Sequence, residues 1–263
     1  MKKTNVIKRI IALLVLSSTV ASLFGCFEPS TYEKDGVTYE LVGDTYAITQ
    51  INDFQTVNTH FIYIQDSVKG RNVTQIGVAQ FMTSELLLRL ATKNVKRIYF
   101  PWSIIRTHGN SSEWNFVGDR PLEYVISAST KTRISDYTTA DHKFVIPFKY
   151  YKKLDTVNPN GYKTLNEEEL ACFLPANISY FFNYEDNPNE GYFFVDIIEE
   201  TGKLTKPPYD PKREGYTFDG WYSDKECTTV WNFENDIVTI EFDENGERIY
   251  EEIGLYAKWV ENN

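Results

Sequence analysis

The residues best suited to chemistry are few and far apart. His60, His108 and His142 are the only histidines, and each is isolated in the sequence. A folded chain could gather them into a metal site, but three separate surface or turn histidines is the simpler interpretation. The chain has none of the short patterns that mark hydrolases, nucleotide-binding loops or zinc proteases. We therefore expect no catalytic residue, no metal and no cofactor.

Two cysteines, Cys172 and Cys227, lie beyond the N-terminal segment. In an oxidising compartment they allow either a disulfide bridge or two unpaired thiols. A nucleophilic thiol needs a neighbouring base, and neither cysteine has a histidine near it in the sequence. The cysteines therefore do not predict catalysis.

Two acidic loops resemble cation sites at first sight. Residues 243–247, with the sequence DENGE, lack the spaced oxygen ligands and the terminal bidentate acid of a calcium-binding loop. Residues 185–190 combine acids with asparagines without that spacing. Both loops are more typical of solvated turns, the first at the tip of a hairpin.

The composition excludes several classes of protein. The 263 residues are 42% hydrophobic and 24% charged, which is typical of a folded domain and unlike a disordered chain. The net charge of −10 argues against a nucleic-acid binder, which needs a basic face. Aromatic residues are unusually frequent at 15%, so the chain must either bury or display many rings. The length allows one or two domains.

Residues 1–25 have the layout of a secretory signal. A basic start precedes an apolar run, Ile10 to Leu16, that is too short to span a bilayer. The leader ends in Leu23-Phe24-Gly25-Cys26, which resembles a bacterial lipobox. The resemblance implies a cleaved signal helix over 1–25, diacylglycerol on the thiol of Cys26 and a polar tether over 26–35. An ordinary secretory signal with an incidental cysteine is the alternative.

Cleavage of this leader would make the chain more acidic. The leader holds four Lys or Arg and no acid, so 23 basic residues would remain against 37 acidic ones, a net charge of −14. Anionic lipids and wall polymers would repel such a chain, so the acyl chains would have to hold it at the membrane. We therefore expect an extracytoplasmic lipoprotein anchored to the bacterial cell membrane.

Residues 36–154 contain short β-rich runs that recur at uneven spacing. The clearest runs are residues 61–64, 95–100, 124–126 and 144–146. Recurring strands that cannot bury their faces alone are typical of stacked repeats. Three segments, GVTYELVGDTYAIT (36–49), GRNVTQIG (70–77) and VKRIYFPWSII (95–105), resemble bacterial surface leucine-rich repeats of the BspA type. The resemblance implies a short, irregular leucine-rich-repeat solenoid. Residues 79–94 depart from the repeat pattern, and their apolar spacing predicts a longer helix.

Residues 155–176 are the expected linker between two parts of the chain. Asn158-Pro159-Asn160-Gly161 is a turn signal. We expect this turn to be followed by a short helix that leads into Pro175.

Residues 177–260 alternate short aromatic-rich runs with turn signals, which predicts a small, mainly β domain. The expected strands are residues 178–184, 192–198, 216–218, 230–233 and 255–259. Residues 237–242 and 248–253 flank the DENGE turn and predict a hairpin. Asp219-Gly220 is a turn signal that should end the third strand.

One block of this C-terminal part is specific enough to indicate a family. Residues 203–233, KLTKPPYDPKREGYTFDGWYSDKECTTVWNF, followed by LYAKW at 255–259, resemble the Listeria–Bacteroides repeat, also called the internalin B-repeat-like module. The resemblance implies a β-grasp-like unit of a bacterial surface protein. The 237–253 hairpin is longer than the usual link into the final strand, and only one copy is present. The fold expected for the chain is therefore mainly β with short helices (α+β).

The aromatic residues of the C-terminal part fall into two groups. Large rings can stabilise a small domain that buries little surface, and this predicts core positions for Phe218, Trp221, Trp231, Phe233 and Trp259. Residues 180–194 carry too many rings for all to lie inside, since alternate residues of a strand face opposite sides. We predict an exposed binding face made of Tyr180, Phe182, Tyr184, Tyr192 and Phe194. Packing of these rings against the solenoid is the alternative.

These features favour a non-catalytic, lipid-anchored surface protein that acts in adhesion or in binding a macromolecular partner. The alternative is a carbohydrate-binding module for wall polysaccharide or host glycan, which would use exposed rings beside Asp or Asn side chains. An enzyme would need a deep pocket of convergent polar groups, and no motif predicts one. The sequence does not name the ligand.

Overall fold

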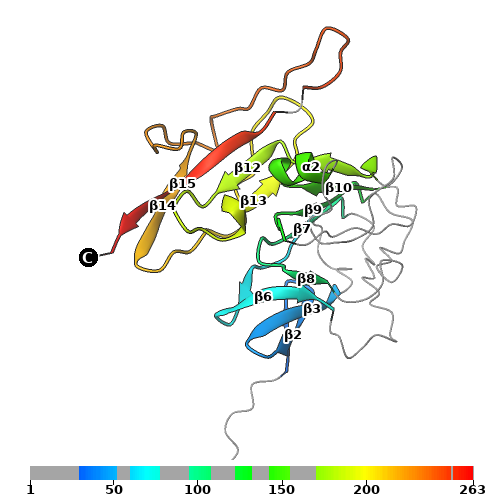
Figure 1. The fold of residues 1–263 in the computed structure, drawn as a ribbon, viewed down its shortest axis with the longest axis vertical. Helices are drawn as coiled ribbons and strands as arrows, with labels where there is room; N and C mark the ends of the chain where they lie inside the picture. The colour runs from blue at the N-terminus through cyan, green and yellow to red at the C-terminus, as the bar shows by residue number, and fades with distance from the viewer. Residues whose placement is uncertain are drawn as a thin grey trace, which may run out of the picture. The chain divides into compact units, whose positions relative to one another are not determined.

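The computed structural model describes residues 30–51, 60–77, 95–107, 122–131, 142–154, 170–249 and 251–262. The predicted signal peptide, Cys26 and the predicted helix over 79–94 lie outside these residues, as does His108. The contacts of Glu33–Asn263 group into one compact unit, distinct from Met1–Tyr32. The described part is mainly β and contains three sheets (Figure 1).

The first sheet has the strand order β1-β2-β3-β6-β5, with β8 paired to β6. Its strands are β1 (Thr31–Lys34), β2 (Val37–Val42), β3 (Thr45–Ile51), β5 (Ser67–Val68), β6 (Arg71–Ile76) and β8 (Arg106–Thr107). The β2–β3 pair is an antiparallel hairpin that turns at Gly43, whose φ of 62° suits a residue without a Cβ. Tyr39, Tyr46 and Ile48 are fully buried on this hairpin.

The second sheet is entirely parallel, and we call it the parallel sheet. It consists of β4 (Phe61–Tyr63), β7 (Arg97–Phe100), β9 (Tyr124–Ser127), β10 (Lys143–Ile146) and β11 (Phe173–Pro175). From β4 to β11 the strands lie side by side in the order in which they occur in the chain. Because every pair is parallel, each connection must bring the chain back to the end of the sheet at which the previous strand began. The four strand positions predicted from the β-rich runs are confirmed. The helix α2 (Phe148–Leu154) follows β10.

The strand β11 lies at the end of the segment that we predicted to be a linker. Phe173 to Pro175 pair with Phe144 to Ile146, and the rings of Phe144 and Phe173 lie 5.6 Å apart. Leu170, which precedes β11, is helical, and the rest of the predicted helix lies outside the described residues. The turn at residues 158–161 lies outside the described residues.

The third sheet, which we call the C-terminal sheet, has the order β13-β12-β15-β14. Its strands are β12 (Ile178–Phe181), β13 (Tyr192–Asp196), β14 (Tyr216–Tyr222) and β15 (Ile253–Glu261), and a short 3-10 turn, η3 (Asn189–Gly191), precedes β13. The central pair β12–β15 is parallel and both outer pairs are antiparallel. The predicted strands are found here except residues 230–233, where Val230 forms only an isolated bridge with Tyr222.

The Asp219-Gly220 turn predicted after the third strand is also wrong. The strand β14 continues through this pair by a β-bulge, and Gly220 takes a φ of 131° that only glycine adopts easily. The extra residue shifts the alternation of side chains, so Phe218 and Trp221 come to the same face with ring centroids 5.2 Å apart. An Asp-Gly pair is compatible with either a turn or a β-bulge. Pairing with a neighbouring strand determines which of the two forms.

The parallel sheet and the C-terminal sheet share one hydrophobic core. Tyr99, Ile126 and Val145 from the first join Tyr180, Phe194 and Leu255 from the second in one cluster of buried side chains. The solenoid and β-grasp classifications, and the domain boundaries, remain predictions. Within the described ranges, no helix has the length and apolar character needed to cross a bilayer.

Candidate functional site

The five rings predicted as an exposed binding face do not lie on an exposed face. Tyr180, Phe182, Tyr192 and Phe194 are at most 4% exposed, and Tyr184 is half-buried. The prediction failed because alternation along a strand does not reveal what covers each side of the sheet. The alternative that we stated, packing against the preceding part of the chain, describes Phe194 and Phe182, whose rings contact those of Tyr99 and Trp102.

A column of aromatic rings joins the two sheets. Tyr63 and Tyr99 of the parallel sheet stack at 4.6 Å, and Tyr99 stacks on Phe194 of β13 at 5.2 Å with an interplanar angle of 16°. Phe194 in turn meets Tyr180 edge-on at 5.7 Å. Offset and edge-to-face pairs of this kind add to the free energy of burying the rings. The column therefore fixes β7 against β13.

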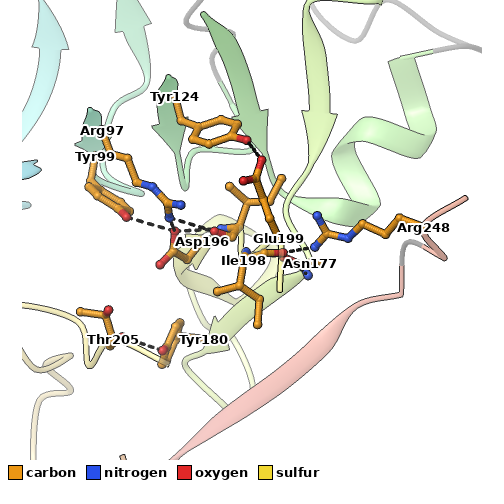
Figure 2. A network of polar contacts seen from close by, with 11 residues as sticks. Arg97, Tyr99, Tyr124, Asn177, Tyr180, Asp196, Ile198, Glu199, Thr205 and Arg248 are labelled. Carbon is orange, nitrogen blue, oxygen red and sulfur yellow. Dashed lines mark hydrogen bonds and ion pairs between the residues drawn. The ribbon is translucent and has the colours of Figure 1, made fainter. Parts of the chain in front are cut away.

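Asp196, at the end of β13, is the polar centre of the same interface (Figure 2). Nη1 of Arg97 and the hydroxyl of Tyr99, both on β7, donate to its Oδ1 at 3.1 Å and 3.0 Å. The backbone N–H of Ile197 donates to the same oxygen at 2.8 Å, and Arg97 also donates to the Ile197 carbonyl at 2.8 Å. A buried carboxylate is thus held by donors from both sheets.

Burial dominates the electrostatics of this cluster. It raises the pKa of Asp196 above the ordinary value of an aspartate, and the charge of Arg97 only partly opposes that shift. Burial also disfavours the charge of Arg97, but Asp196, Tyr99 and Tyr124 together outweigh it and raise the pKa of the guanidinium. Burial, followed by the charge of Asp196, raises the pKa of Tyr63 to about 12 and that of Tyr99 well above 10. The two phenols therefore stay protonated near neutral pH.

A second polar contact lies beside the first. The hydroxyl of Tyr124, on β9, donates to Oε1 of Glu199, and the guanidinium of Arg97 lies 5.1 Å from the centre of the Tyr124 ring. Figure 2 shows Tyr124 and Arg97 approaching the Asp196–Glu199 segment from neighbouring strands. Burial and the bond to Glu199 raise the pKa of Tyr124, so its phenol remains protonated.

Asn189 forms another buried bridge between the two sheets. Its side-chain oxygen accepts from the backbone N–H of Thr130 at 2.7 Å and from the Thr130 hydroxyl at 2.9 Å. Its side-chain amide donates to the carbonyls of Ala128 and Tyr192 at 2.6 Å and 2.8 Å. The amide oxygen thus accepts two hydrogen bonds and the amide nitrogen donates two, so the buried side chain has no unsatisfied polar atom.

Sequence reasoning missed the three residues that carry this interface, Arg97, Asp196 and Asn189. Two of them leave a signal, since Arg97 interrupts the run VKRIYF and Asp196 interrupts YFFVDII. A charged residue inside an otherwise apolar strand predicts a buried partner. The sequence does not say which residue that partner is, because Arg97 and Asp196 are 99 positions apart.

The residues considered for chemistry stay apart in the structure. His60 precedes β4 and His142 precedes β10, and β7 and β9 lie between these two strands. No disulfide joins Cys172 to Cys227. Among the residues that the structure describes, no group of three or more His, Cys, Asp or Glu side chains could hold a metal ion.

The second group of rings lies largely where we expected it. Trp221 is 2% exposed and packs edge-on against Tyr180 at 5.0 Å. Phe218, Trp231, Phe233 and Trp259 are partly buried around the same cluster. The indole N–H of Trp221 has no hydrogen-bond partner, so this ring is held by packing alone.

The face of the C-terminal sheet opposite Trp221 carries a line of rings in register. Tyr192, Phe181, Tyr256 and Tyr222 pair across β13, β12, β15 and β14. Helix α2 reaches one end of this line, where the N–H of Lys149 donates to the Tyr192 hydroxyl. Phe181 and Tyr256 are only partly buried, and their planes differ by 18° at a centroid distance of 5.3 Å. A Cβ on Gly254 would lie 2.7 Å from the Tyr256 hydroxyl, so this ring lies along its own strand.

The comparison with known families bears on this sheet. Residues 180–258 match the family model of the Listeria-Bacteroides repeat domain. This part of the chain is therefore similar to a Listeria-Bacteroides repeat domain, and we call it the repeat domain. The match covers the C-terminal sheet from β12 to β15, and it confirms the resemblance found in residues 203–259.

Two relatives come from Evansella cellulosilytica. One, named "Putative membrane protein", is 33% identical over 75 residues, which cover 28% of this chain and 10% of the relative. The other, named "Putative Gly-rich membrane protein", is 35% identical over 176 residues, which cover 64% of this chain and 19% of the relative. The chain thus spans less than a fifth of the length of either relative.

A solved structure also shows a distant likeness. It is a leucine rich cell surface protein from Faecalibacterium prausnitzii, with 19% identity, 46% of this chain covered, 27% of that chain covered and a TM-score of 0.26. A TM-score this low does not establish a shared fold.

Proposed function

We propose that this chain is a lipid-anchored bacterial cell-surface protein that binds a macromolecular partner and does not catalyse a reaction. The Listeria-Bacteroides repeat domain and the names of the two Evansella relatives support a place in the cell envelope. The leader, with Cys26 at its end, supports the anchor.

The observation that carries the binding role is the shared interface around Asp196. Its ionisable groups are buried and bonded to one another, so they serve cohesion rather than reaction. A repeat domain that is locked to the parallel sheet presents one preorganised surface, and preorganisation lowers the entropic cost of binding. This arrangement suits a display protein whose exposed surfaces meet a partner.

A carbohydrate-binding role is the second candidate, and one observation favours it. Phe181 and Tyr256 form a stacked, partly exposed pair on the face of the C-terminal sheet opposite Trp221. Burial and the charges of Glu252 and Glu226 raise the pKa of Tyr256, and these two carboxylates could accept from sugar hydroxyls. A pair of flat rings with adjacent acceptors matches the apolar face and polar edge of a sugar.

The binding role is tested with the full chain held in a non-ionic detergent. We expect saturable capture of extracted bacterial or host surface proteins and no signal on a glycan array. A glycan signal that Tyr256→Ala abolishes, while exposed Val260→Ala leaves it intact, would replace the first candidate by the second. Turnover of any small molecule by the purified chain would overturn both.

The anchor is tested separately in cells. Cys26→Ala should move the chain from the membrane fraction to the soluble fraction, because it removes the acylated thiol. Ser30→Ala, a neighbouring change outside the lipobox, is the control. An unchanged distribution of the Cys26→Ala variant would contradict the lipobox interpretation.

A further inference from the structure

The segment between β14 and β15 forms a long arm that the rest of the repeat domain does not enclose. We call residues 234–252 the acidic arm. It is a hairpin, because Phe242 bridges to Arg248 and the N–H of Ile249 donates to the Glu241 carbonyl at 3.0 Å. Asp243 closes the tip by accepting from the N–H groups of Asn245 and Glu247, each at 2.8 Å. Figure 1 shows this segment as a long brown excursion leading into β15.

The base of the arm is fixed to the core. Val238 and Ile240 are buried, and Val238 exchanges two backbone hydrogen bonds with Gly202. Arg248 donates to the carbonyl of Ile198, two residues after Asp196 (Figure 2). Glu252 accepts from the hydroxyls of Ser179 and Tyr192 at 2.7 Å and 2.9 Å. The arm is therefore held in place by the same segment that joins the two sheets.

The charge of the arm is strongly one-sided. Its acids are Glu234, Asp236, Glu241, Asp243, Glu244, Glu247, Glu251 and Glu252, and Arg248 is its one basic residue. None of these carboxylates belongs to an ion pair within the described part of the chain. Most are exposed, so their field extends into solvent and attracts cations over roughly a Debye length.

The arm also exposes apolar side chains, which an acidic solvated loop has no need for. Ile237 is 57% exposed, Phe242 is 58% exposed and Ile249 is 39% exposed. Exposed apolar side chains and carboxylates thus occur together on the arm, and docking surfaces combine these two kinds of group. The negative charge of the arm favours a positively charged partner, and its apolar side chains favour a partner that also carries apolar side chains.

We propose that the acidic arm is the docking surface for a cationic, amphipathic segment of another protein. The segment would place Lys or Arg side chains against the carboxylates and apolar side chains against Phe242 and Ile237. This inference rests on the proposed binding function and names the class of its partner. A second copy of this acidic chain does not fit the arm, because its net charge has the same sign. A simple cation leaves the apolar groups without a role.

The test uses the full chain in detergent and a labelled synthetic peptide of alternating Lys and Leu. Fluorescence anisotropy should show saturable binding that weakens as salt is raised. A peptide of alternating Lys and Ser, with the same charge, should bind at least about tenfold more weakly, since apolar contacts are lost. A peptide of alternating Glu and Leu should not bind.

Matched variants assign the binding to the arm. Replacing Glu241, Glu244 and Glu247 together by Gln should lower the affinity for the Lys-Leu peptide by at least about fivefold. The control removes the same charge from exposed acids elsewhere, by replacing Glu185, Glu214 and Glu226 by Gln, and should change the affinity less than about twofold. Phe242→Ser should weaken binding, whereas Val230→Ser, which changes a valine that is 60% exposed outside the arm, should not.

Three outcomes overturn the proposal. If both triple variants weaken binding equally, the peptide senses only the net charge of the chain. If spermine or the Lys-Ser peptide binds as tightly as the Lys-Leu peptide, the exposed apolar groups take no part. If the arm variants bind like the parent while surface proteins are still captured, only this inference fails and the proposed function stands. If the chain captures no surface protein but still binds the peptide through the arm, only the proposed function fails.

Discussion

Asp196 and the acidic arm show two opposite uses of carboxylates within one repeat domain. Asp196 is buried, has three donors and faces a guanidinium 3.1 Å away. The arm, which begins only 38 residues later, carries eight carboxylates that are mostly exposed and outside the described ion pairs. The charge of Asp196 stabilises the contact between the two sheets, whereas the charges of the arm remain available to bind a partner.

The aromatic rings divide in the same way. Tyr99, Phe194 and Tyr180 form a buried column in which each ring touches the next. Phe242 lies on the arm with more than half of its surface exposed. The difference teaches that neither ring density nor charge density in the sequence identifies a binding surface, because burial decides which groups remain free to bind.

The largest effect is expected on the buried side, at Trp221. Trp221→Ala should lower the free energy of unfolding by about 3–5 kcal/mol, because it leaves a cavity beside Tyr180 and Phe193. Denaturant unfolding followed by circular dichroism measures the change. A variant with the parent's unfolding midpoint would mean that the ring contributes little to the shared core.

The next effect concerns the ion pair between the sheets. Arg97→Met should cost about 3 kcal/mol of stability, because it leaves the Asp196 carboxylate buried without its cation. The double variant Arg97→Met with Asp196→Leu should regain most of that loss, since an apolar pair has no charge to compensate. Equal losses in the single and double variants would show that the pair does not act as a unit.

A smaller effect should appear in the pH dependence of stability. The folded state raises the pKa of Asp196, so it binds this proton more tightly than the unfolded state does. The stabilisation is present below the ordinary aspartate pKa of about 4 and is lost as the pH rises through the raised value. The free energy of unfolding of the parent should therefore fall with pH over this range relative to that of Asp196→Asn. Parallel pH profiles would contradict the raised pKa.

The smallest effect on stability is expected in the arm. Phe242→Ser should change the free energy of unfolding by less than about 0.5 kcal/mol, because the ring is exposed and its loss opens no cavity. The same denaturant experiment measures it, with Trp221→Ala as the buried counterpart. A loss as large as that of Trp221→Ala would place Phe242 in the core and remove the contrast between the two regions.

Much of the local structure follows from the sequence alone. The β-rich runs at 61–64, 95–100, 124–126 and 144–146 fix the strands β4, β7, β9 and β10, because β-branched and aromatic residues favour extended backbone. The spacing of Gly215, Gly220, Trp221 and Trp259 identified the repeat domain, and the family match confirms it. The DENGE segment predicted a hairpin tip, which Asp243 forms by accepting two backbone N–H groups.

Only the tertiary structure decided which of these groups face one another. Alternation along β12 and β13 shows that side chains point two ways, but the covering layer comes from residues far away in the sequence, such as Tyr99 and Trp102. The same holds for Asp219-Gly220, which becomes a bulge because β15 pairs on both sides of it. Local sequence thus determined the backbone conformation and the repeat domain, whereas burial, the Arg97–Asp196 pair and the exposure of the arm depended on long-range packing that no local pattern encodes.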